Sequence, residues 1–281
     1  MNISKTKQAL QSYLDGARKA KLRIALVPTM GALHEGHLSL IKEAQKIADV
    51  VVCSIFVNPT QFNDPQDLEK YPRPEENDLR LLQEVGCDIV FLPTVDEMYP
   101  STDQPWHLDL GKLEQVWEGE KRPGHFQGVT QIVYKLFQLV EPDVACFGQK
   151  DFQQVMVIQR LIDLKNLSVS LHIAPTVRSA EGLALSSRNM RLSEAGKQKS
   201  LALYRVLDHI QQHFKTEDLH TLREEALAIL EQEGEIELEY LAICETRSLQ
   251  EVDHIDSSKK HVALLVAWVE GVRLIDNMIL D

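Results

Sequence analysis

Residues 23–57 read RIALVPTMGALHEGHLSLIKEAQKIADVVVCSIFV, and this stretch decides the fold. The apolar run at 23–28 predicts a buried strand, and residues 38–48 show the spacing of apolar side chains that is typical of an amphipathic helix. The run at 50–57 predicts a second strand, and its near-continuous apolar character suits a parallel sheet that is covered on both faces. Two strands joined by a helix are the repeating unit of an α/β fold.

The same alternation of strand and helix continues over the first two thirds of the chain. The further elements that it predicts are helices at 75–85, 128–139 and 151–164 and strands at 89–92, 144–147 and 169–174. Together they predict a doubly wound, mainly parallel, Rossmann-like α/β sheet. The segments at 58–74 and 93–124 are rich in proline and polar residues and too long for simple connections, so we expect them to be substrate loops.

After about Thr176 the pattern changes. The remaining predicted elements are charged helices at 193–214 and 217–233 and strands at 236–243, 261–269 and 272–275. Two helices and a few strands of mostly antiparallel type predict a second, smaller α+β domain. We therefore expect one domain at 1–176 and another at 177–281.

The composition argues against several classes of protein. The 281 residues carry a formal net charge of −12, which argues against a protein that mainly coats nucleic acid, because phosphate binding needs a basic face. No apolar run approaches the roughly 18–20 residues of a membrane span, and the first 21 residues lack the apolar core of a secretory signal. We expect a cytoplasmic protein with no nucleic-acid or membrane partner. Cys53, Cys87, Cys146 and Cys244 form no C-x-x-C pair, so we expect them to be reduced core residues.

The familiar phosphate-binding loops are missing from the sequence. No G-x-G-x-x-G follows a predicted strand. The spacings Gly31 to Gly36 and Gly119 to Gly124 match part of a P-loop, but each is followed by histidine instead of lysine and serine or threonine. A nucleotide would therefore need another binding device.

Such a device follows the first predicted strand, where a glycine-containing turn leads into a helix that starts near His34 to His37. Backbone N–H groups at a helix start form an anion site, and two histidines three residues apart project from one face of the first turn. Imidazoles there can donate to phosphate oxygens and stabilise charge on a transferring phosphoryl group. Two other interpretations stay open: a coincidental H-x-x-H, and half of a zinc site with the remote His125 as a third ligand.

Five segments resemble the pantoate–β-alanine ligase family, which is part of the H-I-G-H nucleotidyltransferase superfamily. The segments are PTMGALHEGH (28–37), IFVNPTQF (55–62), KRPGHFQGV (121–129), FGQKDFQQ (147–154) and LALSSRN (183–189). They occur in the family's order over about the first 190 residues. The last third adds only a weaker match, RLIDN at 273–277.

The resemblance implies an enzyme, an ATP-dependent ligase that joins (R)-pantoate to β-alanine through a pantoyl adenylate and releases AMP and pyrophosphate. ATP is a substrate, and Mg²⁺ is expected through its phosphates and not at a metal site of the protein. The resemblance also implies a homodimer, a nucleotide- and pantoate-binding first domain, and a second domain that acts as a lid.

The site residues follow from the same resemblance. It assigns the catalytic roles to His34, His37 and Lys150. It assigns pantoate to Gln61 and Gln154, β-alanine also to Gln61, and further substrate or pyrophosphate contacts to Asn58, Arg122 and His125. The ATP-binding residues that it implies are Met30, Gly31, Ala32, Leu33, His34, Glu35, Gly36, His37, Gly148, Gln149, Lys150, Asp151, Val177, Leu185, Ser186, Ser187 and Arg188.

The residue types suit these roles. Gln61 offers a donor and an acceptor to a hydroxy acid, and Lys150 offers a point charge to phosphate. Without the resemblance, each would count as an ordinary surface residue, and Ser186 to Arg188 as a common surface tripeptide. Position 149 is Gln where many relatives have Glu, and we expect little consequence because a contact there would run through the backbone.

Two rival functions remain. One is another H-I-G-H enzyme, either a cytidylyl- or adenylyltransferase or an aminoacyl-tRNA synthetase. The acidic charge disfavours the synthetase, and the other four motifs disfavour the transferases. The second rival is a non-catalytic nucleotide sensor that kept the fold. Release of AMP with and without β-alanine distinguishes these alternatives.

Overall fold

The computed structural model describes residues 1–280 and divides into two compact units. The first unit comprises Met1–Gly148 and Gln154–Pro175, and the second comprises Gln149–Gln153 and Thr176–Asp281. The short segment Gln149–Gln153 therefore packs with the second unit, although its neighbours on both sides in the sequence belong to the first.

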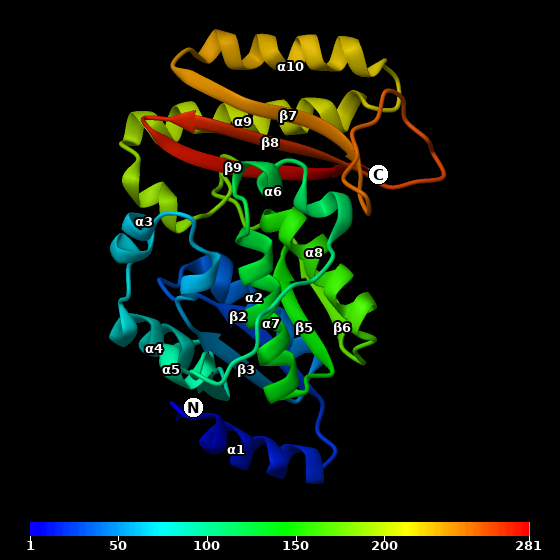
Figure 1. Cartoon of the computed structure of the whole chain (residues 1–281). Coiled ribbons are helices and arrows are strands. Elements are labelled where there is room, and N and C mark those ends of the chain that lie inside the picture. The colour runs from blue at the N-terminus through cyan, green and yellow to red at the C-terminus, as the bar shows by residue number, and fades with distance from the viewer. Residues whose placement is uncertain (281) are drawn as a thin grey trace. The chain divides into compact units, whose positions relative to one another are not determined.

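The first unit is built on a six-stranded sheet whose neighbouring strands are all parallel (Figure 1). The strands, in the spatial order β1-β4-β3-β2-β5-β6, are Asn2–Ser4, Ile89–Phe91, Val50–Ile55, Ile24–Thr29, Val144–Gly148 and Ser170–Ala174. The chain proceeds outward from β2 to β3 and β4, and later returns to place β5 on the other side of β2. This reversal makes the carboxyl ends of β2 and β5 the switch point where α/β sheets bind ligands.

Helices cover both faces of this sheet. The helices are α1 (Lys7–Lys19), α2 (Glu35–Ile47), α3 (Pro65–Lys70), α4 (Glu75–Glu84), α5 (Val95–Met98), α6 (Glu118–Lys121), α7 (His125–Val140) and α8 (Phe152–Lys165). On one face, Ile41 of α2 and Leu82 of α4 are buried in one apolar cluster with Val27 of β2. Successive strand residues point to opposite faces, and Leu26 is fully buried as well, so the sheet is covered on both sides.

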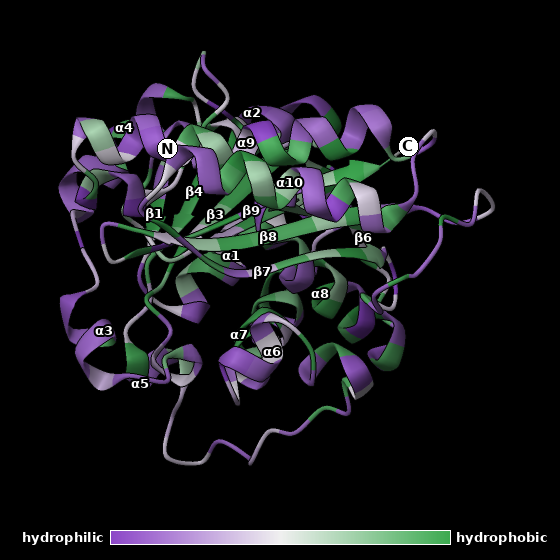
Figure 2. Cartoon of the chain, turned by 90° about the horizontal axis from the view of Figure 1, so that it is seen from above, coloured by the Kyte–Doolittle hydropathy of each residue, from purple (hydrophilic) through white to green (hydrophobic). Residues whose placement is uncertain are grey.

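The second unit contains a three-stranded antiparallel sheet in the order β7-β8-β9. These strands are Ile236–Glu245, His261–Val269 and Val272–Leu280, and the long helices are α9 (Glu194–His213) and α10 (Leu219–Glu233). Both helices pack against the sheet in one apolar cluster that includes Leu207, Leu222 and Leu265. In Figure 2 the strands of this sheet are mostly green, whereas α10 alternates between green and purple, as expected for a helix with one buried face.

The structure confirms the α/β fold with a smaller antiparallel unit, and it adds elements that were not predicted from the sequence. The additions are β1, α1 and the short helices α3, α5 and α6, of which the last three lie inside or beside the predicted substrate loops. Strand β9 also continues five residues beyond its predicted end at Ile275, to Leu280. All four cysteines are buried and none forms a disulfide, as predicted. None of the helices within residues 1–280 is long and apolar enough to cross a membrane.

Candidate active site

The turn after β2 has an unusual backbone that a buried carboxylate braces. Gly31 and Ala32 have φ values of +83° and +49°, so the chain bends sharply at the carboxyl end of the strand. Asp78 of α4, only 1% exposed, accepts hydrogen bonds from the backbone N–H groups of Ala32 and Leu33, each at 2.8 Å. Burial raises the pKa of the Asp78 carboxyl, and these two donors partly oppose the rise.

His34 and His37 cap the N-terminus of α2 through their side chains. These contacts determine which ring nitrogen carries the proton in each neutral imidazole. Nδ1 of His34 accepts the N–H of Gly36 at 3.1 Å, and Nδ1 of His37 accepts the N–H of His34 at 3.4 Å. A backbone N–H can only donate, so the proton of each neutral ring lies on Nε2. The two rings lie 4.2 Å apart between centroids and offer two Nε2–H donors at the N-terminus of α2. A Cβ atom on Gly36 would come within 2.9 Å of the His34 ring, which explains the glycine between them.

The zinc interpretation of this pair finds no support. Among residues 1–280, the only group of three side chains placed to bind one metal ion is His209, Glu217 and Glu225, in the second unit. His34 and His37 therefore have no third ligand within reach in the described chain.

A buried amide network follows β3. The Asn58 side chain is 1% exposed, donates to Gln61 Oε1 at 3.0 Å and to the carbonyl of Gly128 at 3.1 Å, and accepts from the Tyr99 hydroxyl at 2.7 Å. Gln61 in turn donates from Nε2 to the thioether of Met30 at 3.1 Å. Sulfur is a weak acceptor, so a ligand oxygen would be a better partner for this amide.

Helix α7 also holds the turn Pro59–Gln61 in place. His125 donates from Nδ1 to the carbonyl of Gln61 at 2.9 Å, since a carbonyl can only accept. A Cβ atom on Gly128 would lie 2.3 Å from the carbonyl oxygen of Thr60, so only glycine permits this close approach. Arg122, which precedes the helix, lies 4.0 Å from the Glu118 carboxylate. The structure thus brings Met30, Asn58, Gln61 and His125 together.

Lys150 lies in the second unit, within the 3-10 turn Gln149–Asp151 that precedes α8. The sequence predicts it at the start of this helix, one turn from Gln154 and on the same side. Gln154 follows in the first turns of α8 and is half-buried. Gly148 ends β5 in the first unit, and Asp151 is exposed.

A second cationic segment comes from the loop before α9. Ser186 caps the 3-10 helix Ser187–Arg191, accepting the N–H of Arg188 at 3.2 Å. The loop is held by the N–H of Leu185, which donates to the carbonyl of Val177 at 2.9 Å. Arg188 reaches strand β9 and donates to the carbonyl of Arg273 at 3.4 Å.

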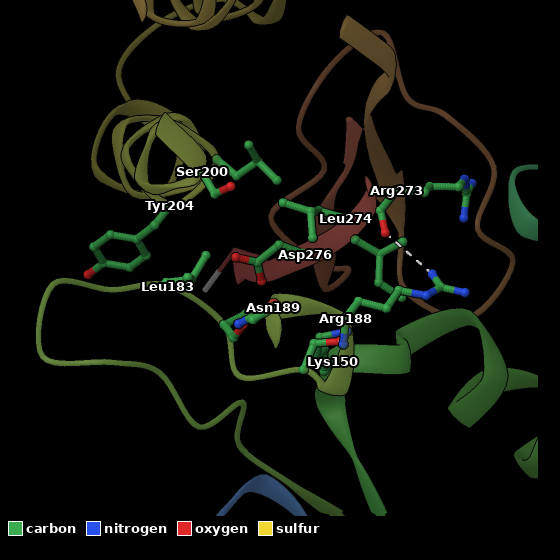
Figure 3. A pocket seen from close by; sticks show the side chains of 13 residues that line it. Lys150, Leu183, Arg188, Asn189, Ser200, Tyr204, Arg273, Leu274 and Asp276 are labelled. Carbon is green, nitrogen blue, oxygen red and sulfur yellow. Dashed lines mark hydrogen bonds between the residues drawn. The ribbon is translucent and has the colours of Figure 1, made fainter. Parts of the chain in front are cut away.

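These segments line one pocket of the second unit (Figure 3). Lys150, Ser186 and Arg188 face it together with Arg273 and Asp276 of β9. Arg273 is paired with Glu239 at 2.8 Å. Within residues 1–280, neither Lys150 nor Arg188 has a carboxylate within ion-pair distance. The pocket therefore holds two positive charges that have no ion-pair partner among residues 1–280, which suits an anionic ligand.

A family model described as pantoate-beta-alanine ligase matches residues 2–279. The chain belongs to this family. It is 45% identical to the pantothenate synthetase of Cytophaga hutchinsonii over 276 residues, 97% of each chain, and 44% identical to the pantoate–β-alanine ligase of Schizosaccharomyces pombe over 281 residues, 99% of this chain and 98% of that one.

Solved structures of pantoate–β-alanine ligases share the fold. The pantothenate synthetase of Thermus thermophilus superposes with a TM-score of 0.91 at 37% identity, covering 99% of both chains. A Francisella tularensis pantoate–β-alanine ligase, complexed with beta-gamma ATP and β-alanine, gives a TM-score of 0.80 at 33% identity, covering 99% of this chain and 97% of that one.

Three side chains that hold these segments in place were missed or underrated from the sequence. Asp78 and Tyr99 carry no local signal, because a buried carboxylate or hydroxyl looks like a surface one in the sequence. Asn277 lay in the weak RLIDN match. The Gln149 side chain also has a partner within the protein, because its Nε2 donates to Asn277 Oδ1 at 3.2 Å.

Proposed function

We propose that this protein is the ATP-dependent ligase that joins (R)-pantoate to β-alanine and releases pantothenate, AMP and pyrophosphate. The observation that carries the proposal is the family match over residues 2–279. The two positive charges of the pocket support it, because triphosphate and the departing pyrophosphate are anions. Mg²⁺ enters with ATP as part of this substrate.

The chemistry needs an activated carboxylate, since carboxylate oxygen is a poor leaving group. An oxygen of pantoate attacks the α-phosphorus of ATP, the bond to the bridging oxygen breaks, and pyrophosphate leaves. The amine of β-alanine then attacks the acyl carbon of the pantoyl adenylate, AMP leaves with the shared oxygen, and the amine gives up a proton. No covalent bond to the protein forms, so catalysis rests on positioning and on stabilisation of charge.

The side chains divide between these tasks. The two Nε2–H groups of His34 and His37 donate to phosphate oxygens, and Lys150 and Arg188 stabilise the charge that moves onto pyrophosphate. Gln61 and Gln154 hold pantoate, with Gln61 also near the incoming β-alanine, and Asn58 and His125 keep the Gln61 turn in place. Exclusion of water protects the mixed anhydride from hydrolysis.

The remaining ATP contacts are backbone and packing contacts. We assign them to Met30 and Val177 beside the nucleotide, to the turn Gly31–Leu33, to Glu35 and Gly36, to Gly148–Gln149 with Asp151, and to Leu185–Ser187. Arg122 is a further candidate for pyrophosphate.

We also propose that the enzyme works in the cytoplasm as a homodimer. The four cysteines are buried and form no disulfide, which supports a reducing compartment. Family membership supports the dimer, and light scattering on the purified protein tests it: a homodimer has twice the 32.0 kDa mass of one chain.

Product analysis tests the proposed reaction. Purified protein with MgATP, pantoate and β-alanine should form AMP, pyrophosphate and pantothenate in equal amounts. Omission of β-alanine should stop formation of pantothenate and sustained release of AMP. Pyrophosphate release that needs a different acceptor would indicate another nucleotidyltransferase, and ATP binding without turnover would indicate a sensor.

A further inference from the structure

The turn that carries Lys150 is held by a side chain from the far end of the chain. Asn277 of β9 donates from Nδ2 to the carbonyl oxygens of Gln149 at 3.0 Å and Lys150 at 2.8 Å. Its Oδ1 accepts the Gln149 Nε2 at 3.2 Å, so the orientation of the amide is fixed. All these residues belong to the second unit, and Asn277 is only 2% exposed.

Asn277 is itself braced. Its backbone N–H donates to Asp276 Oδ1 at 2.7 Å, and its carbonyl accepts from Arg178 at 3.3 Å. Arg178 and Asp276 form a paired contact through two hydrogen bonds of 2.5 and 2.9 Å, and Asp276 is 5% exposed. The backbone N–H and carbonyl of Asn277 are therefore both held, which fixes the point from which its amide reaches the lysine turn.

This support matters because a lysine side chain is long and flexible. Electrostatic catalysis depends on donors that are already in place when charge develops, and a displacement of about 1 Å can cost about a hundredfold in rate. The 3-10 turn has only three residues, Gln149–Asp151, and two of its carbonyls are fixed by one amide. Loss of that amide would leave both carbonyls without this donor and release the backbone from which Lys150 extends.

We infer that Asn277 is a positioning residue for Lys150, which fixes the backbone of the lysine turn for the adenylation step without touching substrate. The inference rests on the proposed role of Lys150. The inference gives the RLIDN segment (273–277) of strand β9 a role in the reaction, through Asn277, in addition to its role in the antiparallel sheet.

A double-mutant cycle tests the inference. Single-turnover adenylation is measured in wild type, Lys150→Ala, Asn277→Ala and the double variant, with amide formation from preformed pantoyl adenylate as the second readout. We expect Lys150→Ala to slow adenylation about a hundredfold, and Asn277→Ala about tenfold or more. In the Lys150→Ala background, Asn277→Ala should add no more than about twofold, because its target is gone. Amide formation should change little in Asn277→Ala.

Two further variants sharpen the test. Asn277→Asp keeps the size, loses both N–H donors and sets a carboxylate against two carbonyl oxygens, so it should slow adenylation at least as much as Asn277→Ala. It replaces that variant if Asn277→Ala does not fold. Gln211→Ala is the matched control, because this exposed amide also donates to a carbonyl near Asn277 on β9, that of Ile279 at 3.1 Å. It should leave adenylation unchanged.

The inference would be overturned if Asn277→Ala reduced the adenylation rate by the same factor in the wild-type and Lys150→Ala backgrounds. A wild-type adenylation rate in Asn277→Asp would overturn it as well. Failure of the proposed function looks different, because wild type itself would then form no pantoyl adenylate. A Lys150→Ala variant with normal adenylation would refute the role of the lysine and the inference together.

Discussion

The two hydrogen bonds of the Gln61 side chain differ in strength, and this difference predicts what is lost when the side chain is removed. Its Oε1 accepts from Asn58, which also donates to the carbonyl of Gly128, whereas its Nε2 donates to the weakly accepting sulfur of Met30. Removal of the side chain therefore leaves Asn58 with a partner. The main loss falls on a ligand that binds the Nε2 donor.

We predict that Gln61→Ala raises the dissociation constant of pantoate about tenfold or more, the scale for a lost hydrogen bond to a charged group. The dissociation constant of ATP should stay within about twofold, and the melting temperature should barely change. Calorimetric titration with each ligand gives the answer. Asn58→Ala is the contrasting variant and should lower the melting temperature, because it removes the buried centre of the network. Equal weakening of both ligands by Gln61→Ala would refute this division of roles.

At the scale of elements, the contact of helix α7 with the turn Pro59–Gln61 depends on Gly128, which has no side chain. Gly128 and Gly16 are both helical glycines, but a Cβ atom on Gly128 would meet the Thr60 carbonyl at 2.3 Å, whereas one on Gly16 would meet no atom within 4 Å. The two positions therefore form a matched pair.

We predict that Gly128→Ala lowers the free energy of unfolding by about 1–3 kcal/mol through overpacking and also weakens pantoate binding, because it displaces the turn that carries Gln61. Gly16→Ala should raise the free energy of unfolding by about 0.5–1 kcal/mol. Urea unfolding of both variants measures these changes. A Gly128→Ala protein as stable as wild type would show that α7 and the turn can separate without cost.

The brace between α4 and the turn after β2 gives a pH-dependent prediction. Burial raises the pKa of Asp78 in the folded protein above its unfolded value of about 4. The folded protein therefore holds a proton on this carboxyl at pH values where the unfolded chain has lost it, so the contribution of Asp78 to stability falls as pH rises through that window. Below the unfolded pKa this cost vanishes.

The comparison with Asp78→Asn isolates this effect. The variant should be less stable than wild type at pH 7 by about 1–3 kcal/mol, because an amide cannot accept both N–H groups through two oxygens. The advantage of wild type should grow as pH falls from 7 to 4, as measured by urea unfolding at each pH. An advantage that shrinks over this range would show that the donors of Ala32 and Leu33 outweigh burial.

The predictable elements were those with a strong local pattern. The buried runs that became β2, β3 and β5 are apolar because a covered parallel sheet shields both faces from water. Strand β1 has only three residues at an edge, too few for a periodic signal. Helix α1 does carry a signal, the cap Thr6 followed by Leu10, Leu14 and Ala17, so this helix was predictable from the sequence although it was not predicted.

At the scale of the whole molecule, contacts between residues far apart in the chain could not be predicted from the sequence. The pair His34 and His37 was visible because both lie in one helical turn. Asp78 lies 46 residues from Ala32, and Asn277 lies 127 residues from Lys150, and no local rule joins such pairs. The buried polar side chains that hold the two turns therefore emerged only from the structure.

The central claim is that adenylation of pantoate is a complete step that precedes the arrival of β-alanine. Exchange of labelled pyrophosphate into ATP by the purified protein tests it most directly. With MgATP and pantoate but no β-alanine, we predict exchange that depends on pantoate, because a pantoyl adenylate forms and reverts. Exchange that occurs only when β-alanine is present would contradict the two-step account.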